Sequence, residues 1–449
     1  MSGNFRSFDR ETLFLMPPSV QDWLPKEHLA RFVVELVEHL DLRMVRESYA
    51  GRGSAAYHPE MLVALLFYGY ATGIRASRKL ETATYESVPF RFIAANTHPD
   101  HDTISDFRMR FLPQLTQIFE QLLVVAHESG FLRVGQVSVD GTKIRASASK
   151  HNALSLKRGT ELQRRFRREA QRMLELAEQA DREDTGDDDF HLPAELARRE
   201  DRIAAIKAAM ERIRARETER IEREKAEREE AKAERARFEE ANGRRFETRL
   251  SYHRIERNPN AQINLTDEDS RIMPSGEGFV QAYNGQLAVD TKSQLILSAH
   301  LTQHPIDVRQ LQPALEKLAR LPIGKPTALI ADGGYYSELN VERCAALGID
   351  PYISRGREKH HWGMRHWHRP KEPAAGASAL DLMRYRLRTA EGRAIYAQRK
   401  CTVEPVIGNL KRSMGLRQFL LRGFEKVSGE WTLASAAWNI RRLHAMSWA

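Results

Sequence analysis

Apolar residues recur at helical spacing through the N-terminal part of the chain. Between Leu29 and Leu40 they fall three and four positions apart, which predicts a helix with one apolar face. A second apolar run, residues 61–71, follows Pro59, and proline suits the first turn of a helix. This run is too short to cross a bilayer. The pattern predicts an α-helical domain over residues 1–130.

The apolar period changes to two after residue 131, which is typical of β-strands. The expected order is strand 133–140, strand 279–290, strand 294–301, helix 307–320, strand 326–332, helix 337–347 and strand 350–354. Three antiparallel-type strands followed by helix, strand, helix and strand match an RNase H-like mixed sheet. We therefore expect an α/β (α+β) fold, with the sheet domain built from residues 131–150 and 271–420.

A highly charged stretch, residues 151–270, separates the first strand from the others. Two segments with apolar positions at helical spacing flank the acidic break at residues 184–189. The apolar positions are Leu162, Phe166, Met173 and Leu174, then Ile203, Ile206, Met210 and Ile213. This pattern predicts an antiparallel helical hairpin inserted into the sheet domain, with Glu–Arg pairs on its solvated faces. A C-terminal helix is expected within residues 421–449.

Composition and charge narrow the classes of function. The chain has 449 residues, of which 41% are hydrophobic, and a net charge of +9. It can therefore build a sizeable core, and a polyanionic partner is favoured. The sequence shows no cleavable leader pattern and no membrane-length apolar run, and its two cysteines, Cys344 and Cys401, form no metal-type pair. These features favour the reducing cytoplasm, without disulfides or a membrane.

Three acidic residues stand where a strand or a helix would hold them rigidly. Asp140 and Asp332 each end an apolar stretch, and Glu404 falls on an expected helix. Three carboxylates can hold two Mg²⁺ ions, because Mg²⁺ prefers hard oxygen ligands, and such sites perform phosphoryl chemistry on nucleic acids. Taken alone, each Asp-Gly pair is more simply a turn after a strand. The joint pattern of the three acids favours the metal site.

Basic residues accompany Glu404. Lys400 lies one turn before it and Lys411 two turns after it, on the same face of the expected helix. Together with Arg412 they could hold nucleic acid phosphates beside the metal. The alternative is an ordinary surface helix with a Lys–Glu pair. Pro405 indicates that Glu404 lies near the start of this helix or at a kink.

Two further segments each have a functional and an ordinary interpretation. Basic side chains from Arg75 to Arg110 match a helix-turn-helix-like DNA reader or a small bundle with solvated arginines. The histidines from His360 to His368 have no cysteine partner and no finger spacing, which argues against zinc. With their neighbouring tryptophans they suit either contacts to a nucleic acid end or an exposed loop. The sequence contains neither a nucleotide-binding P-loop nor a serine-hydrolase elbow.

Several short motifs follow one another in a fixed order. They are Tyr57-His-Pro-Glu-Met-Leu62, Asp102-Thr-Ile-Ser-Asp-Phe-Arg108, Val139-Asp-Gly-Thr-Lys-Ile-Arg145, Asn264-Leu-Thr-Asp-Glu-Asp-Ser-Arg-Ile-Met273, Tyr283-Asn-Gly-Gln286, Ala331-Asp-Gly-Gly-Tyr335 and Glu404-Pro-Val-Ile-Gly-Asn-Leu-Lys411. On these motifs, over nearly its whole length, the chain resembles the DDE transposases of bacterial insertion sequences that have a helical N-terminal domain.

The resemblance implies an enzyme that uses two Mg²⁺ (or Mn²⁺) ions, with Asp140, Asp332 and Glu404 as catalytic metal ligands. The expected DNA-binding residues are Lys143, Arg145, Arg399, Lys400, Lys411 and Arg412. The helix that bears the third acid carries a Tyr, Arg and Lys signature in this family. Lys411 keeps the expected interval from Glu404, whereas Tyr396 and Arg399 fall one residue further upstream, so that Lys400 is an alternative to Arg399.

The resemblance implies DNA strand cleavage and strand transfer at insertion-sequence ends, on nucleoid DNA in the bacterial cytoplasm. The expected partners are terminal inverted repeats and target DNA, bound by a homodimer because two ends must be held together. The N-terminal bundle and the helical insertion would bind the repeats or dimerise. The alternatives are a metal-dependent nuclease on the same fold, a non-catalytic DNA-binding relative, and a scaffold built around residues 151–270.

Overall fold

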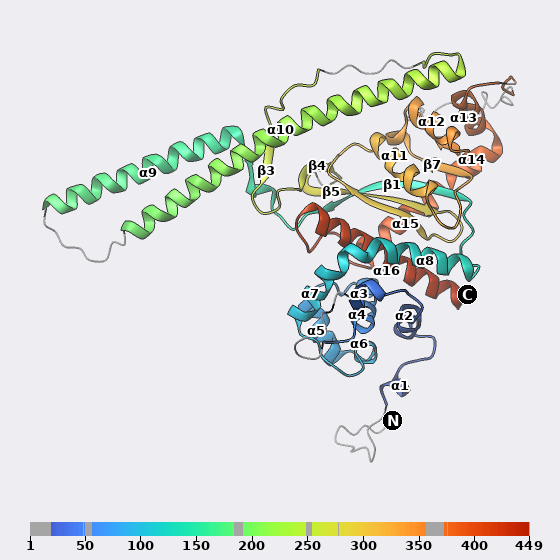
Figure 1. Ribbon diagram of the computed structural model, residues 1–449, viewed down its shortest axis with the longest axis horizontal. Helices are drawn as coiled ribbons and strands as arrows, with labels where there is room; N and C mark the ends of the chain where they lie inside the picture. Colours follow the sequence, from blue (N-terminus) through green and yellow to red (C-terminus); the bar gives the residue numbers. More distant parts are fainter. Residues whose placement is uncertain are drawn as a thin grey trace, which may run out of the picture. The chain divides into compact units, whose positions relative to one another are not determined.

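Figure 1 traces the chain of the computed structural model. The described residues are 19–47, 49, 56–183, 192–247, 254–276, 278–355, 372–374 and 376–448. The chain divides into two units, one formed by residues 1–132 with 432–449 and the other by residues 133–431. Among the described helices, none is long and apolar enough to cross a membrane.

The first unit is helical, as the spacing of its apolar residues predicts. At its core is α4 (Pro59–Thr72), in which every residue from Leu62 to Ala71 is buried. A helix covered on every side needs apolar residues all round, which explains the nearly continuous apolar run. The other helices are α1 (Val20–Trp23), α2 (Leu29–Glu38), α3 (Arg43–Glu47), α5 (Ser77–Glu86), α6 (Val88–Ile93), α7 (His101–Phe111), the 3₁₀ turn η1 (Leu112–Gln114), α8 (Leu115–Glu128) and the part of α16 (Phe424–Ser447) that follows Trp431.

Packing accounts for part of the basic pattern between Arg75 and Arg110. Arg75 and Arg108 are buried, and Arg108 Nη1 donates a hydrogen bond to the carbonyl oxygen of Arg75. Arg78, Lys79 and Arg110 are exposed. These two arginines are buried, so they do not belong to a DNA-reading surface.

A six-stranded mixed sheet forms the centre of the second unit. Its strands are β1 (Gln136–Arg145), β4 (Arg271–Ser275), β5 (Gly278–Asp290), β6 (Ile296–Thr302), β7 (Ala328–Ala331) and β8 (Asp350–Ile353), and β2 (Ala153–Ser155) pairs separately with β3 (Gln262–Asn264). The order is β4–β5–β1–β7–β8, with β6 also paired to β5. β1 runs antiparallel to β5 and parallel to β7, and β7 runs parallel to β8. This is the RNase H-like mixed sheet that the sequence predicts.

Strand β1 is longer than the alternating pattern predicts. The expected strand ended at Asp140, whereas β1 continues to Arg145 and stays paired with β5 throughout. The period of two persists, since Ile144 is buried and Arg145 is exposed. Glycine and charged residues after Asp140 concealed the pattern, because they are uncommon in strands. Asp140 therefore lies in the middle of a strand and not at its end.

Helices cover both faces of the sheet (Figure 1). They are α11 (Leu311–Ala319), α12 (Glu338–Ala346), α13 (Ala379–Arg388), α14 (Ala390–Ala397) and α15 (Arg399–Arg412), with the 3₁₀ turns η2 (Lys150–Asn152), η3 (Val308–Gln310) and η4 (Gly333–Tyr335). α11 packs against β5 and β6, whereas α15 packs against β1 and β5, and α12 and α13 contact β8. The helix that bears Glu404 is thereby held against the strand that bears Asp140.

The predicted helical insertion consists of α9 (Leu156–Glu183) and α10 (Leu192–Asn242), which pack together. Near the sheet they enclose a small apolar core. Its buried residues are Leu154, Ile206, Ala209, Met210, Ile213, Ala261 and Ile263, with Leu156, Leu162 and Phe166 packed against them. The insertion therefore has a core of its own, shared with the short sheet of β2 and β3.

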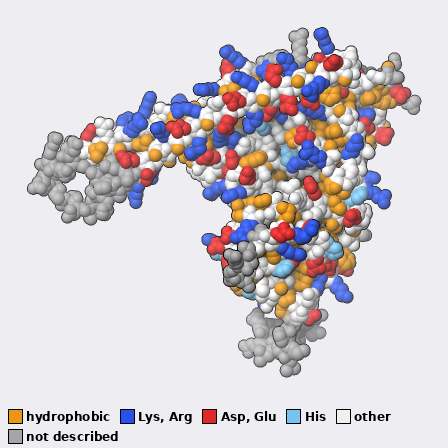
Figure 2. Space-filling model, in the orientation of Figure 1, with side chains coloured by type: hydrophobic (Ala, Val, Ile, Leu, Met, Phe, Trp, Pro, Cys, Tyr) orange, Lys and Arg blue, Asp and Glu red, His pale blue; other side chains and the backbone are white. Residues whose placement is uncertain are grey.

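Ion pairs fasten the C-terminal half of α10 to the sheet domain. Arg343 Nε of α12 lies 2.9 Å from Glu234 Oε1, and Arg309 Nη1 lies 2.6 Å from Glu227 Oε2. Figure 2 shows basic and acidic side chains interspersed along this helix. α10 carries equal numbers of basic and acidic residues, so its charged side chains can pair with one another and with the sheet domain.

Candidate active site

Asp140 and Asp332 lie at the same level on neighbouring parallel strands. Val139 of β1 is paired with Ala331 of β7, so the next residue on each strand is one of the two acids. Asp332 directly follows β7 and begins the turn η4, where its Oδ1 accepts a hydrogen bond from the Gly334 amide at 2.8 Å. Successive residues of a strand point to opposite faces, and residues paired on neighbouring strands share a face, so both acids project from the face opposite to Val139 and Ala331.

Glu404 of α15 is connected to Asp140 by ion pairs that both residues form with Arg399. Arg399 Nη1 lies 3.6 Å from Asp140 Oδ2 and 2.9 Å from Glu404 Oε1. One guanidinium nitrogen therefore stands between an acid of β1 and an acid of α15. The sequence left open whether Arg399 or Lys400 accompanies the acids. In the structure Arg399 contacts them and the Lys400 side chain is exposed.

Pro405 neither starts nor ends the helix that carries Glu404. α15 spans Arg399–Arg412 with the proline inside it, so Glu404 does not lie near a helix start. A proline has no amide hydrogen and leaves the carbonyl one turn earlier without its usual donor. That carbonyl belongs to Cys401, and it accepts a hydrogen bond from Gln294 Nε2 at 3.2 Å. The side chain from the sheet domain compensates the missing bond.

Burial raises the pKa of Asp140 to about 6. Its amide neighbour Gly141 opposes this rise by donating a hydrogen bond to Oδ1 at 2.8 Å. The negative charge of Asp332 adds to the rise, Arg399 counteracts it, and Asp307 adds a smaller contribution. A partly buried acid that is repelled by neighbouring acids is a site where positive charge is stabilised.

The carboxylates of Asp140, Asp332 and Glu404 are suitable ligands for a divalent cation. Within the described part of the chain, no three His, Cys, Asp or Glu side chains are gathered closely enough to hold a metal ion, so the three acids do not form a closed ligand set here. They are, however, carboxylates, the ligands that Mg²⁺ and Mn²⁺ prefer, and two of them already flank a cation. A metal ion bound by Asp140 and Glu404 would take the place of the Arg399 guanidinium.

A fourth acid, Asp307, lies nearby, and nothing in the sequence had singled it out as a functional residue. Its Oδ1 accepts hydrogen bonds from Asn284 Nδ2 and from Gln286 Nε2, each at 2.7 Å. Gln286 in turn accepts a hydrogen bond from the Tyr335 hydroxyl, and Tyr335 belongs to the turn that follows Asp332. Gln286 thus connects β5 to the loop that carries an acid. The available sequence signal was the pair of amides Asn284 and Gln286 among the apolar residues of this strand, and both are buried.

The predicted DNA-binding residues differ in how accessible they are. Lys143 Nζ lies 3.5 Å from Asp307 Oδ1, and only 16% of its side chain is exposed. Arg145, Lys400 and Arg412 are exposed, and Lys411 is half-buried. Arg145 lies beside the strand-like segment after α15, since its amide donates a hydrogen bond to the Arg417 carbonyl. Arg145, Lys400 and Arg412 are therefore accessible to a ligand, whereas Lys143 is already paired with Asp307.

Tyr396 does not join the acids. It lies in α14 and packs, with Leu387 and Ile395, against Ala328, Ile330 and Tyr352 of the sheet. The cluster from His360 to His368 lies outside the described residues.

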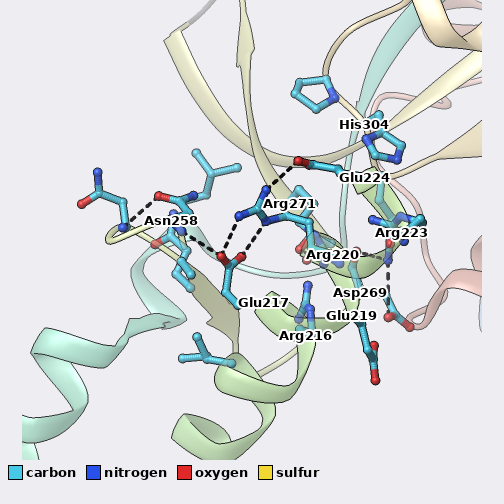
Figure 3. Close-up of a pocket in the computed structure, with 18 of the residues that line it drawn as sticks. Arg216, Glu217, Glu219, Arg220, Arg223, Glu224, Asn258, Asp269, Arg271 and His304 are labelled. Carbon is cyan, nitrogen blue, oxygen red and sulfur yellow. Dashed lines mark hydrogen bonds and ion pairs between the residues drawn. The ribbon is translucent and has the colours of Figure 1, made fainter. Parts of the chain in front are cut away.

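A large cleft of about 900 Å³ lies apart from the acids, between α10 and the β3–β4 region. Figure 3 shows that its side chains engage one another. Glu217 pairs with Arg220 at 3.0 Å and accepts a hydrogen bond from the Asn258 amide, and Arg220 also lies 2.9 Å from Glu224. Its basic and acidic side chains offset each other, so the size of this cleft does not make it the candidate site.

Replacing Gly141 with Ala is expected to destabilise the protein by about 1–3 kcal/mol. A β-carbon at this position would lie 2.8 Å from Asp307 Oδ1 and closer still to Gln286 Nε2. Both groups are held by hydrogen bonds and cannot withdraw freely. Chemical denaturation measures the loss in the free energy of unfolding.

The control is Gly408→Ala in α15, where nothing lies within 4 Å of the added carbon. There the free energy of unfolding is expected to rise by up to about 1 kcal/mol. Equal stability of the two variants would contradict the tight packing around Gly141.

Two family models match the chain. Residues 18–110 match a model described as a transposase domain (DUF772), and residues 254–440 match one described as a transposase DDE domain. Asp332 and Glu404 lie within the second match, and Asp140 lies before it. Comparisons with curated proteins and with solved structures found no match. The first match lies on the helical domain and the second on the mixed sheet, in the expected order along the chain. The chain therefore belongs to the DDE transposases of the insertion-sequence type.

Proposed function

We propose that this protein cleaves DNA at the ends of an insertion sequence and joins the freed ends to target DNA, with Asp140, Asp332 and Glu404 as the catalytic residues. The observation that supports this proposal is the meeting of two strands and one helix on one face of the sheet. There Asp140 lies beside Asp332, and one nitrogen of Arg399 links it to Glu404.

The three carboxylates would hold two Mg²⁺ or Mn²⁺ ions. Bound there, the ions would supply an activated water and neutralise charge on the phosphate in the transition state. Asp140 and Asp332 are fixed by the sheet, so they would define the position of the scissile phosphate. Arg399, displaced from between the acids, would be free to bind a phosphate oxygen. The exposed Arg145, Lys400 and Arg412 and the half-buried Lys411 would position the DNA backbone.

The chemistry consists of two in-line substitutions at phosphorus. In the first, a water oxygen bonds to phosphorus, the bond to the 3′-oxygen breaks, and that oxygen leaves as a hydroxyl. In the second, this 3′-hydroxyl bonds to a phosphorus of the target strand and displaces the target's own 3′-oxygen. Both steps need the same arrangement of charge, so one site can perform them in turn. The proposed partners are terminal inverted repeats and target DNA, bound by a homodimer on nucleoid DNA in the bacterial cytoplasm.

A strand-transfer assay tests this function. The substrate is a precleaved duplex that carries the sequence flanking the protein's own reading frame, with a supercoiled plasmid as target and Mg²⁺ or Mn²⁺ present. The expected result is a covalent joint product that requires the 3′-hydroxyl, so a 3′-deoxy end gives none. Cleavage of intact DNA without any joining would instead identify a nuclease on the same fold.

A further inference from the structure

Helix α9 differs from α10 in the balance of its charges. From Leu156 to Glu175 it carries seven basic and three acidic residues, whereas α10 is balanced. The basic residues are Lys157, Arg158, Arg164, Arg165, Arg167, Arg168 and Arg172, and all of them are exposed. The excess of positive charge is therefore confined to one helix of the insertion, and it is on the surface.

The packing of α9 against α10 fixes which side of α9 faces outward. Leu162 and Phe166 pack on the apolar core, and at Gly159 a β-carbon would lie 2.7 Å from Met210 Sδ. These positions share one face of the helix. At 3.6 residues per turn, Lys157, Arg164, Arg168 and Arg172 fall on the opposite face. We call these four residues the outer row. They span about 22 Å at 1.5 Å per residue.

The four basic residues of the outer row outnumber the acids on the same face of α9, which are Glu161 and Glu175. Among the described residues, none of its four members forms an ion pair. The described ion pairs of α9 involve Glu169, with Arg165 at 3.4 Å and Arg199 at 3.7 Å. Arg164 and Arg168, like Arg168 and Arg172, are four positions apart, and like charges at that spacing destabilise a helix. In α10, by contrast, residues four positions apart carry opposite charges and pair, as Arg223 does with Glu227. A polyanionic ligand would offset the repulsion within the outer row.

We propose that the outer row binds the phosphate backbone of duplex DNA. This proposal rests on the proposed function, because it assumes that DNA is the substrate. A straight row of guanidinium and ammonium groups on a helix suits a regular line of phosphates and carries no base-reading pattern, so the contact would be independent of sequence. The sequence that follows the row, from Glu178 to Asp189, is rich in acidic residues.

The salt dependence of DNA binding tests this proposal. The variant is the full chain with Lys157, Arg164, Arg168 and Arg172 all replaced by Gln, which removes charge but keeps a good helix former. The matched control replaces one lysine and three arginines of α10, Lys207, Arg202, Arg214 and Arg237, which are likewise exposed. Affinity for two duplexes of unrelated sequence is measured by fluorescence anisotropy over a range of salt, without divalent ions so that no DNA is cut.

Each phosphate contact contributes about 0.9 to the slope of log affinity against log salt. The outer-row variant is therefore expected to lose about 2 to 4 units of slope and at least about tenfold in affinity, equally on both duplexes, and the control is expected to lose less than about 1 unit. An outer-row variant whose slope and affinity match those of the control overturns the proposal.

Other outcomes are also decisive. A loss on only one of the two duplexes would contradict a sequence-independent contact. Unchanged DNA binding with altered sedimentation would show that the outer row holds the acidic segment of a second copy, and would equally overturn the proposal. Binding is measured without cleavage, so a failure of the proposed catalytic residues leaves this result unaffected. Conversely, if the outer row does not bind DNA, the proposed catalytic function is unaffected, because cleavage by the wild-type protein is measured separately.

Discussion

Replacing Asp140 with Asn, Asp332 with Asn or Glu404 with Gln is expected to lower DNA strand cleavage by about 10³-fold or more, because each change removes a charge that positions metal and phosphate. Cleavage of an end-containing duplex is followed in Mg²⁺ and in Mn²⁺. DNA binding, measured without divalent ions, should change little, since the exposed basic residues are retained. These three variants conserve side-chain shape, so folding should be preserved.

The matched control is Asp350→Asn. Asp350 begins a strand of the same sheet and pairs with Arg386 at 2.6 Å, but it lies away from the three acids in sequence and is not part of their contacts. This variant should cleave like the wild-type protein. Wild-type rates in any one of the three test variants would remove that residue from the site, and wild-type rates in all three would remove the proposed chemistry.

Asp140→Asn is also expected to make the protein more stable at pH 7 in the absence of divalent ions, by about 3 kcal/mol. The pKa of Asp140 is raised to about 6 in the folded protein, against about 3.9 in an unfolded chain. The folded state therefore binds the proton more tightly than the unfolded state. As pH rises from about 4 to about 6, the wild-type protein loses stability because it must hold an unfavourable charge.

The sign of this effect gives a clear pH profile. Below about pH 3 both states of the wild-type protein carry the proton, so the difference between wild-type protein and Asp140→Asn should vanish. It should grow through pH 5 and level off above about pH 7. Urea denaturation at a series of pH values, with a chelator present, measures it. A variant that is less stable than wild-type protein at pH 7, or a difference that does not change with pH, would contradict the buried, repelled carboxylate.

The expected loss of cleavage and the expected gain in stability of Asp140→Asn have the same cause. A metal site needs negative charges close together, and close negative charges cost folding free energy until a cation arrives. In this structure Arg399 partly supplies that cation. The same substitution should thus abolish catalysis and improve stability, and a residue that served only to stabilise the fold would not show this combination.

The order of β1, β5, β6, β7 and β8 and of the helices between them follows from the sequence, because alternating and helical apolar spacings differ plainly. β4, which pairs with β5 in the same sheet, was not among the predicted strands. The strands at 279–290 and 294–301 were predicted to within a few residues of β5 and β6. The end of β1 was not predicted, since Gly141 and Lys143 are poor strand formers and owe their conformation to pairing with β5. Local preference was overridden there by tertiary structure.

The candidate site was only partly predictable, for a related reason. Asp332 could be chosen because it ends an apolar strand, and Glu404 because of the motif around it. The part played by Arg399 depends on where α15 sits against β1, which no local pattern records. Asp307 and Tyr335 join the site through Gln286, and such a connection between distant segments becomes visible only when the fold brings them together.

The most direct test of the central claim asks which parts of the chain surround a bound ion. Fe²⁺ is substituted for Mg²⁺ in the full-length protein, and hydroxyl radicals generated at the iron with ascorbate and peroxide cut the nearby backbone. Fragment masses should then show cuts close to Asp140, Asp332 and Glu404 together, suppressed by excess Mg²⁺. Cuts at other places in the chain, or near only one of these residues, would mean that the three acids do not share a metal site.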